Sequence, residues 1–289
     1  MPIELSSVSY TYAPDTPYAA DALNSVSLKI KDGEFVGIIG RTGCGKSTLI
    51  QIMDGLLEPA SGKVMLDDKD INAKAYNRDA LRKSVGVVFQ FPEYQLFETT
   101  VKKDIAFALK HFGLTKTEVN QAVHDALEMV GFDYDKVCDK SPLSFSGGER
   151  RKLAIAGVLV LKPRFLILDE PVAGLDAAGR KEFLTLLNKL NANGTAVIMV
   201  SHNLDVLAEY AKRIILMKNG CIVKDGTAAE ILSDSDLLAD GGLKAGQVQK
   251  AVQLLQKSGV RIQSDIIKYN QLLDAVSDLY GGAVNDTSS

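Results

Sequence analysis

A glycine-rich stretch near the N-terminus has the residue types and spacing of a phosphate-binding loop. Residues 40–48 read GRTGCGKST and fit the pattern G-x-x-x-x-G-K-[ST]. Glycines let backbone N–H groups turn inward around phosphate oxygens, and the following helix adds the partial positive charge of its N-terminus. In such a loop we expect Lys46 to reach the β- and γ-phosphates, Ser47 to ligate Mg²⁺, and Thr48 to add a hydroxyl toward the phosphates.

Two carboxylates at the end of an apolar strand supply the second half of this chemistry. The stretch 165–170 reads FLILDE and ends in Asp169 and Glu170. Two acids at this place are costly unless a cation or a catalytic role accounts for them. We expect Asp169 to hold Mg²⁺ through water, and Glu170 to orient or deprotonate the attacking water. The two segments together predict a P-loop nucleotide hydrolase.

The elements around these residues predict an α/β fold. Apolar and alternating runs predict strands, and periodic stretches predict helices. Strands that alternate with helices imply a largely parallel sheet covered on both faces, and the helical block is an insertion. Strands are expected at 3–12, 25–30, 34–40, 63–71, 84–90, 165–170 and 195–202, with a hairpin at 213–226. Helices are expected at 46–57, within 100–160, and at 176–194 and 203–213.

The texture of the chain changes after about residue 233. Residues 234–247 read as a loop, and 244–259 and 264–280 read as two amphipathic helices. They are too few to form a large core alone, so we expect a small C-terminal extension that packs on something else. The tail 281–289 is expected to be disordered.

Composition narrows the class of protein. The chain has 289 residues, of which 46% are hydrophobic and 24% charged, as in an ordinary soluble globular protein. A net charge of −3 argues against a general nucleic-acid binder. The three cysteines have no metal-ligand spacing and suit a reducing cytosol. The N-terminal residues do not have the pattern of a signal peptide, and no apolar run approaches the length that a membrane span needs. We therefore expect that, in a membrane process, this chain would act through partners.

The remaining motifs resemble those of ATP-binding cassette (ABC) ATPases, and the resemblance covers roughly residues 3–232. Tyr12 is similar in position to the aromatic residue that stacks on adenine, with Tyr18 as a competitor. The other matches are the Q-loop glutamine Gln90, the signature SGGE at 146–149, the D-loop PVAGLD at 171–176 with Asp176 at the subunit junction, and the switch histidine His202.

This resemblance implies a fold and a set of site residues. It implies a P-loop NTPase of the ABC type in residues 1–232, with an antiparallel β subdomain and a helical subdomain at about 91–160, and a dimerisation extension in residues 233–289. The implied catalytic residues are Lys46, Gln90, Glu170 and His202, and the implied metal ligands are Ser47, Gln90 and Asp169. The implied ATP-binding residues are Tyr12, Gly40, Arg41, Thr42, Gly43, Cys44, Gly45, Lys46, Ser47, Thr48, Gln90, Ser146, Gly147, Gly148, Glu149, Asp169, Asp176 and His202.

The signature explains why the chain has a second glycine-rich stretch. In this family two ATPase domains face each other head to tail, and each ATP lies between the phosphate loop of one and the signature of the other. The family's LSGGQ reads FSGGE here, so Glu149 completes S-x-x-E with Ser146, a capping box at a helix start. Glu149 either only caps this helix or also repels the γ-phosphate and changes turnover. Val172 stands where the family usually has Thr.

The segment after Gln90 resembles one group within the family. FQFPEYQLFETTV, 89–101, is similar to the ATPases of energy-coupling factor (ECF) transporters, in particular their second ATPase subunit. The implied partners are a non-identical ATPase subunit, a membrane scaffold protein and a small substrate-binding membrane protein for a vitamin or a metal ion. The implied location is the cytoplasmic face of the bacterial cell membrane. Either a groove for scaffold helices or the core of the helical insertion would use Phe91, Pro92, Tyr94, Leu96 and Phe97.

Other ABC proteins fit less well. A DNA-associated ABC ATPase would carry long coiled coils between phosphate loop and signature, and no sustained heptads are present. A translation-type ABC protein would need two cassettes in one chain, whereas this sequence shows one. A conventional ABC importer ATPase is a third possibility, and the FPEYQLF stretch counts against it. A cobalt- or nickel-type ATPase that works as a homodimer is the closest alternative.

Overall fold

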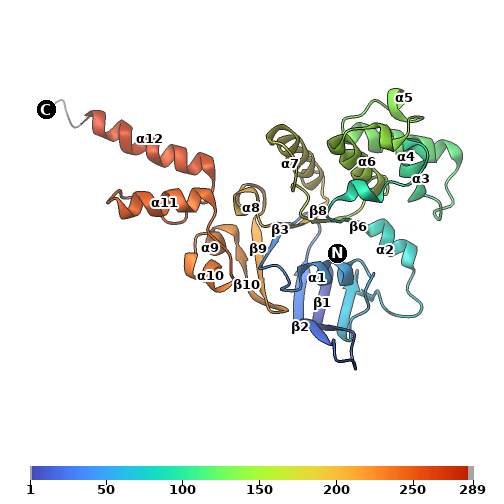
Figure 1. The fold of residues 1–289 in the computed structure, drawn as a ribbon, viewed down its shortest axis with the longest axis horizontal. Coiled ribbons are helices and arrows are strands. Elements are labelled where there is room, and N and C mark those ends of the chain that lie inside the picture. The colour runs from blue at the N-terminus through green and yellow to red at the C-terminus, as the bar shows by residue number, and fades with distance from the viewer. Residues whose placement is uncertain (1, 286–289) are drawn as a thin grey trace. The chain divides into compact units, whose positions relative to one another are not determined.

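The computed structural model describes residues 2–285, and the chain divides into two compact units. The first unit contains the residues up to Phe35 and Ser47–Val200, and the second contains Val36–Lys46 and the residues from Ser201 onward. Figure 1 shows the order of the elements along the chain. The expected boundary between residues 232 and 233 is a different division and stays a prediction.

The first unit begins with an antiparallel sheet of strand order β2-β1-β4-β5. The strand predicted at 25–30 begins earlier, at Ala20, because Tyr12 pairs with Ala20 and the hydroxyl of Thr11 donates to Asp21. The strands of this sheet are β1 (Ile3–Tyr12), β2 (Ala20–Ile30), β4 (Ser61–Leu66) and β5 (Lys69–Asp70).

Three parallel strands form the core of the first unit. The strands β6 (Val85–Val88), β7 (Phe165–Asp169) and β8 (Ala196–Val200) pair in the order β6-β7-β8. All of β8 is buried, and so are the first four residues of β7. A strand buried on both faces reads as a continuous apolar run, which is why the sequence predicted these strands well.

Helices account for most of the rest of the first unit. The helices α3 to α6 gather into one group, drawn in green in Figure 1, and α6 packs against η1, α3 and α4. The sequence did not predict α2, η1 or η2. The helical elements are α1 (Lys46–Met53), α2 (Arg78–Ser84), η1 (Pro92–Gln95), α3 (Val101–Phe107), α4 (Lys116–Met129), α5 (Tyr134–Val137), η2 (Pro142–Ser144), α6 (Gly147–Leu159) and α7 (Ala177–Ala192).

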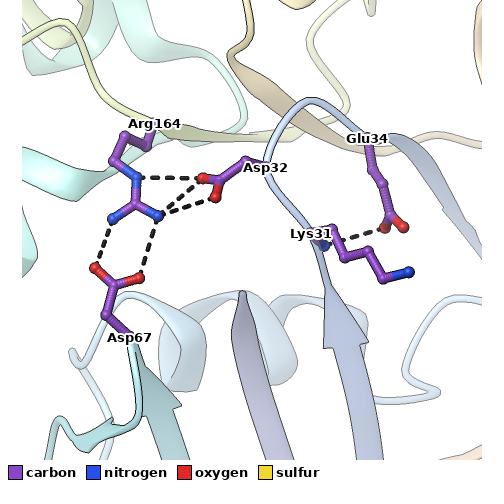
Figure 2. A network of polar contacts seen from close by, with 5 residues as sticks. All are labelled: Lys31, Asp32, Glu34, Asp67 and Arg164. Carbon is purple, nitrogen blue, oxygen red and sulfur yellow. Dashed lines mark hydrogen bonds and ion pairs between the residues drawn. The ribbon is translucent and has the colours of Figure 1, made fainter. Parts of the chain in front are cut away.

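An arginine joins the two sheets of the first unit. Arg164 stands just before β7, and Figure 2 shows its guanidinium between Asp32, in the turn after β2, and Asp67, in the turn after β4. Its Nη2 donates to Asp32 at 2.9 Å and to Asp67 at 3.1 Å. The hydrogen bonds of Asp67 raise the pKa of Arg164 above its ordinary value. These bonds fix the start of the strand that ends in Asp169.

The second unit contains a parallel pair and a hairpin. The strand β3 (Phe35–Ile39), which begins with the last residue of the first unit, pairs in parallel with β9 (Arg213–Lys218). The predicted hairpin at 213–226 is present: β9 continues through a turn at Asn219 and Gly220 into β10 (Cys221–Thr227). The helix α8 (Leu204–Tyr210) precedes the hairpin, and α9 (Ala228–Leu232) follows it.

In its described residues the C-terminal extension contains the helices α10 (Ser235–Asp240), α11 (Gln247–Lys257) and α12 (Tyr269–Asn285). The predicted loop at 234–247 is wrong in part, because Asp234 caps α10 and Leu238 is fully buried. Apolar residues of the two predicted amphipathic segments pack on each other within the extension itself, where Val248 and Val252 pack against Ile266. The helix α12 includes residues 281–285 of the tail expected to be disordered, and residues 286–289 lie outside the described residues.

Candidate nucleotide site

The second unit positions the phosphate loop against the hairpin. Gly40 follows β3 with φ at 151°, and a Cβ there would overlap the carbonyl oxygen of Met217 in β9. The N–H of Gly220, in the hairpin turn, donates to the carbonyl of Cys44 at 3.0 Å. Gly43 and Gly45 also have positive φ values, 81° and 105°. The sequence therefore places glycine where the loop turns and where the hairpin approaches it.

Lys46 is the best-buried charge of the loop, with 7% of its surface exposed. Its Nζ donates to the carbonyl of Gly40 at 2.7 Å and to that of Arg41 at 3.1 Å. Arg41, Thr42 and Gly43 are exposed, and they form the outer part of the loop. Two carbonyls of the loop thus accept from the ammonium group of Lys46, while the outer residues of the loop are exposed.

In the first unit the predicted hydroxyl and carboxylate meet. The Oγ of Ser47, the second residue of α1, donates to Oδ2 of Asp169 at 3.0 Å, although the two residues are 122 positions apart. The carboxylate stands at the last residue of β7. Hydroxyl and carboxylate oxygens are ligands that Mg²⁺ accepts in nucleotide sites. Among the described residues no group of three or more His, Cys, Asp or Glu side chains could hold a metal ion.

Glu170 has an uncommon backbone conformation. Its φ is 48°, in the left-handed region that non-glycine residues rarely adopt. Its N–H donates to the carbonyl of Val200 at 3.0 Å, and its carbonyl accepts from the N–H of Ala173 at 3.2 Å. Strained backbone of this kind persists only where its surroundings hold it, and it gathers at functional sites.

Tyr12, at the end of β1, lies beside the helix that follows the phosphate loop. Its hydroxyl is 3.1 Å from Oγ1 of Thr48, so Thr48 contacts Tyr12 in this structure. The Tyr12 ring packs edge-on against Tyr10, and 40% of its surface is exposed. Tyr18 is 86% exposed. Of the two competing tyrosines, Tyr12 is the one that hydrogen bonds to this helix, through Thr48.

The signature forms the capping box that its sequence predicted. The Oγ of Ser146 donates to Oε2 of Glu149 at 2.7 Å, and the N–H of Ser146 donates to the same oxygen at 2.9 Å. These hydrogen bonds hold the pKa of Glu149 below its ordinary value, so the side chain is anionic at neutral pH. Ser146, Gly147, Gly148 and Glu149 are all exposed at the N-terminus of α6.

The other expected site residues lie at the ends of strands and helices. Gln90 is exposed, two residues beyond β6. Asp176 caps α7 by accepting from the N–H of Gly179 at 2.7 Å. His202, in the second unit, is exposed and follows the buried Ser201.

The segment after Gln90 is partly surface and partly core. Phe91, Tyr94 and Phe97 are exposed, whereas Pro92 is buried and Leu96 is half-buried. The buried Pro92 fits the reading of this segment as core, whereas a groove for scaffold helices stays a prediction for the exposed Phe91, Tyr94 and Phe97.

Comparisons with known proteins agree with this geometry. The family model described as "ABC transporter" matches residues 23–173. The energy-coupling factor transporter ATP-binding protein EcfA2 of Clostridium perfringens is 42% identical over 280 residues, which cover 96% of this chain and 98% of that protein. The EcfA2 protein of Caldanaerobacter subterraneus subsp. tengcongensis is 43% identical over 286 residues, which cover 99% of this chain and 100% of that protein.

The chain belongs to the ABC transporter family, among its energy-coupling factor ATP-binding proteins.

Solved structures of ABC ATPases have the same fold. The structure of cbiO1 from Clostridium perfringens, described as part of the ABC transporter complex cbiONQ, superposes with a TM-score of 0.72 at 32% identity and covers 88% of this chain and 98% of that one. A dimeric structure of the ATP-binding cassette MJ0796, bound to ADP and Pi, superposes with a TM-score of 0.68 at 29% identity over 78% of this chain and 98% of that one. The expected fold class and ATPase activity are thus confirmed.

Two charged residues of this ABC ATPase were missed by the sequence reading. Arg151 is 4% exposed, and its Nε lies 3.3 Å from Oε2 of Glu93. In the sequence Arg151 stands between Arg150 and Lys152, and such a run reads as a solvated helix face. The burial of Arg151 becomes evident only in the structure, where α6 packs against η1.

No described helix of this ABC ATPase is both long enough and apolar enough to cross a membrane.

Proposed function

We propose that this chain is the ATP-binding and ATP-hydrolysing subunit of an ECF-type importer that takes up a vitamin or a metal ion. The observation that carries the proposal is the 3.0 Å hydrogen bond between Ser47, directly after the phosphate-loop lysine, and Asp169, directly before Glu170. This contact supports the proposal because it puts the hydroxyl expected to ligate Mg²⁺ beside the carboxylate expected to hold the same ion. The names of the curated relatives support the ECF type.

Binding of ATP would use the charge that the loop already holds. Lys46 donates to the carbonyls of Gly40 and Arg41, and a triphosphate is a stronger acceptor than either because its oxygens are charged. The backbone N–H groups of the exposed residues 41–43 and the N-terminus of α1 would add to the attraction. Tyr12 is our choice over Tyr18 for stacking on adenine, because Tyr12 contacts Thr48.

Magnesium fits the donor set next to the loop. Ser47 would be a direct ligand, Asp169 would hold the ion through water, and Gln90 would complete the set when ATP is bound. The ion, when bound, would neutralise charge on the β- and γ-phosphates. The existing hydrogen bond between Ser47 and Asp169 keeps both oxygens on one spot, which lowers the cost of assembling the site.

Hydrolysis would rest on Glu170 as the residue that orients or deprotonates water. The two backbone hydrogen bonds of Glu170 fix its peptide units, and a fixed backbone limits where its carboxylate can reach. His202 and Gln90 would contact the γ-phosphate. Their exposure leaves both side chains accessible to a nucleotide or to a partner chain.

The signature would close a second nucleotide site in trans. A Cβ added at Gly147 or Gly148 would meet no described atom within 4 Å, and neither glycine is among those with positive φ. Glycine costs about 1 kcal/mol relative to alanine in a helix, so this chain alone gives no reason for either. Room for a phosphate bound to another chain is such a reason. Asp176 would lie at the same subunit junction.

The partners would be a second, non-identical ATPase subunit, a membrane scaffold protein and a substrate-binding membrane protein. The exposed ring of Phe97 packs edge-on against that of Phe107, with 4.8 Å between the ring centroids. Phe107 also lines a groove of about 440 Å³, together with Arg82, Val85, Gly86, Val87, Ala108, His111, Gly157, Val158 and Leu161. Our proposed scaffold surface consists of this groove and of the exposed rings of Phe91, Tyr94 and Phe97 in the segment after Gln90. Attachment through these partners would place the chain at the cytoplasmic face of the membrane.

The decisive experiment substitutes Glu170 in the assembled transporter. The partner ATPase carries a disabling change in its own catalytic glutamate, so that only the site of this chain turns over. Glu170→Gln should keep ATP binding and lower turnover about 10²–10⁴-fold, as loss of a general base does. Turnover near that of the unchanged subunit would refute the assignment of Glu170.

A further inference from the structure

A buried positive charge lies directly behind the signature. Arg151 is in the second turn of α6 and only 4% of its surface is exposed. Arginine is among the residues that are almost never fully buried unless they are paired, because an isolated charge loses its hydration. The contacts of Arg151 therefore have to account for its position.

The guanidinium of Arg151 joins three segments of the first unit. Its Nε is 3.3 Å from Oε2 of Glu93, in the turn η1 that follows Gln90. Its Nη1 donates to the carbonyl of Ala173 at 2.5 Å, in the loop that follows Glu170. Its own backbone belongs to the signature helix. One side chain thus contacts the segments after Gln90 and after Glu170.

The contact with Ala173 continues to Glu170. The N–H of Ala173 donates to the carbonyl of Glu170 at 3.2 Å, which closes a tight turn. Arg151 holds the outer side of this turn, and Glu170 stands at its start with φ at 48°. A residue in the left-handed region relaxes unless the surroundings fix it. The hydrogen bond from Arg151 is one of the bonds that fix this turn.

The contact with Glu93 leads in the other direction, to the surface. Glu93 is 16% exposed at its side chain, and the next residue, Tyr94, is 81% exposed. A partner that binds the exposed ring of Tyr94 would shift η1, and with it the carboxylate that pairs with Arg151.

We propose that Arg151 is a positioning residue that transmits the place of the η1 turn to the peptide of Glu170. It couples the proposed scaffold surface to hydrolysis, and it does not itself touch the nucleotide. This inference rests on the proposed role of Glu170 as the residue that acts on water. A purely structural ion pair would instead stabilise the fold and leave the chemistry of the folded enzyme unchanged.

The test measures kcat and KM for ATP in the assembled transporter, with the partner's catalytic glutamate disabled. Arg151→Met keeps the unbranched stem and removes the guanidinium. We expect kcat to fall at least about tenfold while KM for ATP changes less than about twofold, because misplacement of a reacting group lowers the chemical step. The kcat of Arg151→Lys should lie between those of Arg151→Met and the unchanged enzyme. A lysine ammonium can bond to Glu93 or to Ala173, but it does not have the planar guanidinium that contacts both.

The matched control is Lys152→Met. Lys152 is the next residue of α6 and carries the same charge, but its Nζ pairs with Glu182 at 2.6 Å. This variant should leave kcat within about twofold of the unchanged enzyme, because the Lys152 ammonium bonds to α7 rather than to η1 or to the loop after Glu170. An equal loss of kcat in Lys152→Met and Arg151→Met would overturn the proposal.

A second variant tests the coupling without removing the arginine. Glu93→Gln keeps the shape of the side chain and removes its charge, so it should lower kcat in the original background and have no further effect in Arg151→Met. Additive effects, an unchanged kcat in Glu93→Gln, or a rise in KM alone would each contradict the relay. Glu170→Gln in the same assay separates the two ideas: if it retains turnover, the proposed function fails and the relay with it, whereas an inactive Glu170→Gln beside normal Arg151 and Glu93 variants refutes the relay alone.

Discussion

The hydroxyl of Ser47 donates a 3.0 Å hydrogen bond to the carboxylate of Asp169, across 122 positions of sequence. The bond joins the first turn of α1 to the end of β7. It brings a neutral and an anionic oxygen together where a divalent cation would need both.

The first prediction concerns this pair. Ser47→Ala removes the hydroxyl and should weaken the apparent affinity for Mg²⁺ in ATP hydrolysis about 10–100-fold, a loss typical of changes that disturb a metal site. Titration of ATPase activity with Mg²⁺ measures the shift. Ser47→Thr is the matched control, because it keeps the hydroxyl and should remain close to the original affinity. Equal Mg²⁺ curves for all three proteins would contradict the assignment.

The second prediction concerns the scaffold surface. Tyr94→Ser together with Phe97→Ser removes two exposed rings, which are 81% and 63% exposed. Each ring should contribute about 1.5–3 kcal/mol when buried by a partner, so scaffold recovery in a pull-down should fall strongly while ATP binding remains. The nearby but half-buried Leu96 is a poor choice for this test, because its change would disturb folding as well. Unchanged recovery would place the docking surface elsewhere.

The third prediction concerns the signature. In a mixed complex with Glu170 disabled here, only the composite site on the partner's phosphate loop reports. Ser146→Arg should abolish turnover at that site, since a long charged side chain would fill the space beside Gly147 and Gly148. Ser146→Ala should instead cost about 0.5–2 kcal/mol of stability through the lost cap. If Ser146→Arg leaves turnover intact, the motif serves only as a helix cap.

Glu149 offers a related, fourth prediction. Its side chain is anionic at neutral pH because the hydrogen bonds of Ser146 hold its pKa below the ordinary value. Glu149→Gln can still accept from Ser146 and keep the cap, but it removes a negative charge that would face the γ-phosphate. ATP affinity at the composite site should rise by about threefold or more, the size of a charge interaction in a partly aqueous site. An equal or lower affinity, measured by nucleotide titration, would leave Glu149 with the capping role alone.

The fifth prediction concerns pH. Burial raises the pKa of Asp54, directly after α1, from 3.8 to about 7, so the folded state holds a proton that the unfolded state releases. The resulting stability is complete below about pH 4 and is lost as the pH rises through about 7. Asp54→Asn should therefore raise Tm more at pH 8.5 than at pH 5.5, whereas Asp135→Asn, at an exposed position, should show no such difference. A gain that is equal at both pH values would rule out the raised pKa.

The sequence predicted the elements whose signals are local. The continuous apolar run predicted β7, and the hairpin at 213–226 was also predicted. The strand and the helix expected on either side of the phosphate loop are both present. The helix α10 was missed because its capping residue Asp234 lies among other polar residues that also favour a loop. The burial of Leu238 decides for a helix there, and burial is a property of the folded chain.

Within the site, the sequence predicted residue types better than their contacts. It placed Ser47 and Asp169 in one function because their motifs are known to act together. It could not find Arg151, because a guanidinium in a run of three basic residues looks like a solvent-facing one. Its partners Glu93 and Ala173 are far from it in sequence, and only the packing of α6 on η1 brings them together.

The contacts of Arg164 have a consequence for synthesis of the chain. Its carboxylate partners Asp32 and Asp67 precede it by 132 and 97 residues, and both bond to the same nitrogen, so they lie close together. During translation the N-terminal sheet emerges first, and until residue 164 follows, these two like charges lack the guanidinium that bonds to both of them in the finished protein. The nascent sheet is therefore less stable than the finished one. When the segment that leads into β7 is added, its guanidinium bonds to both carboxylates and offsets their repulsion.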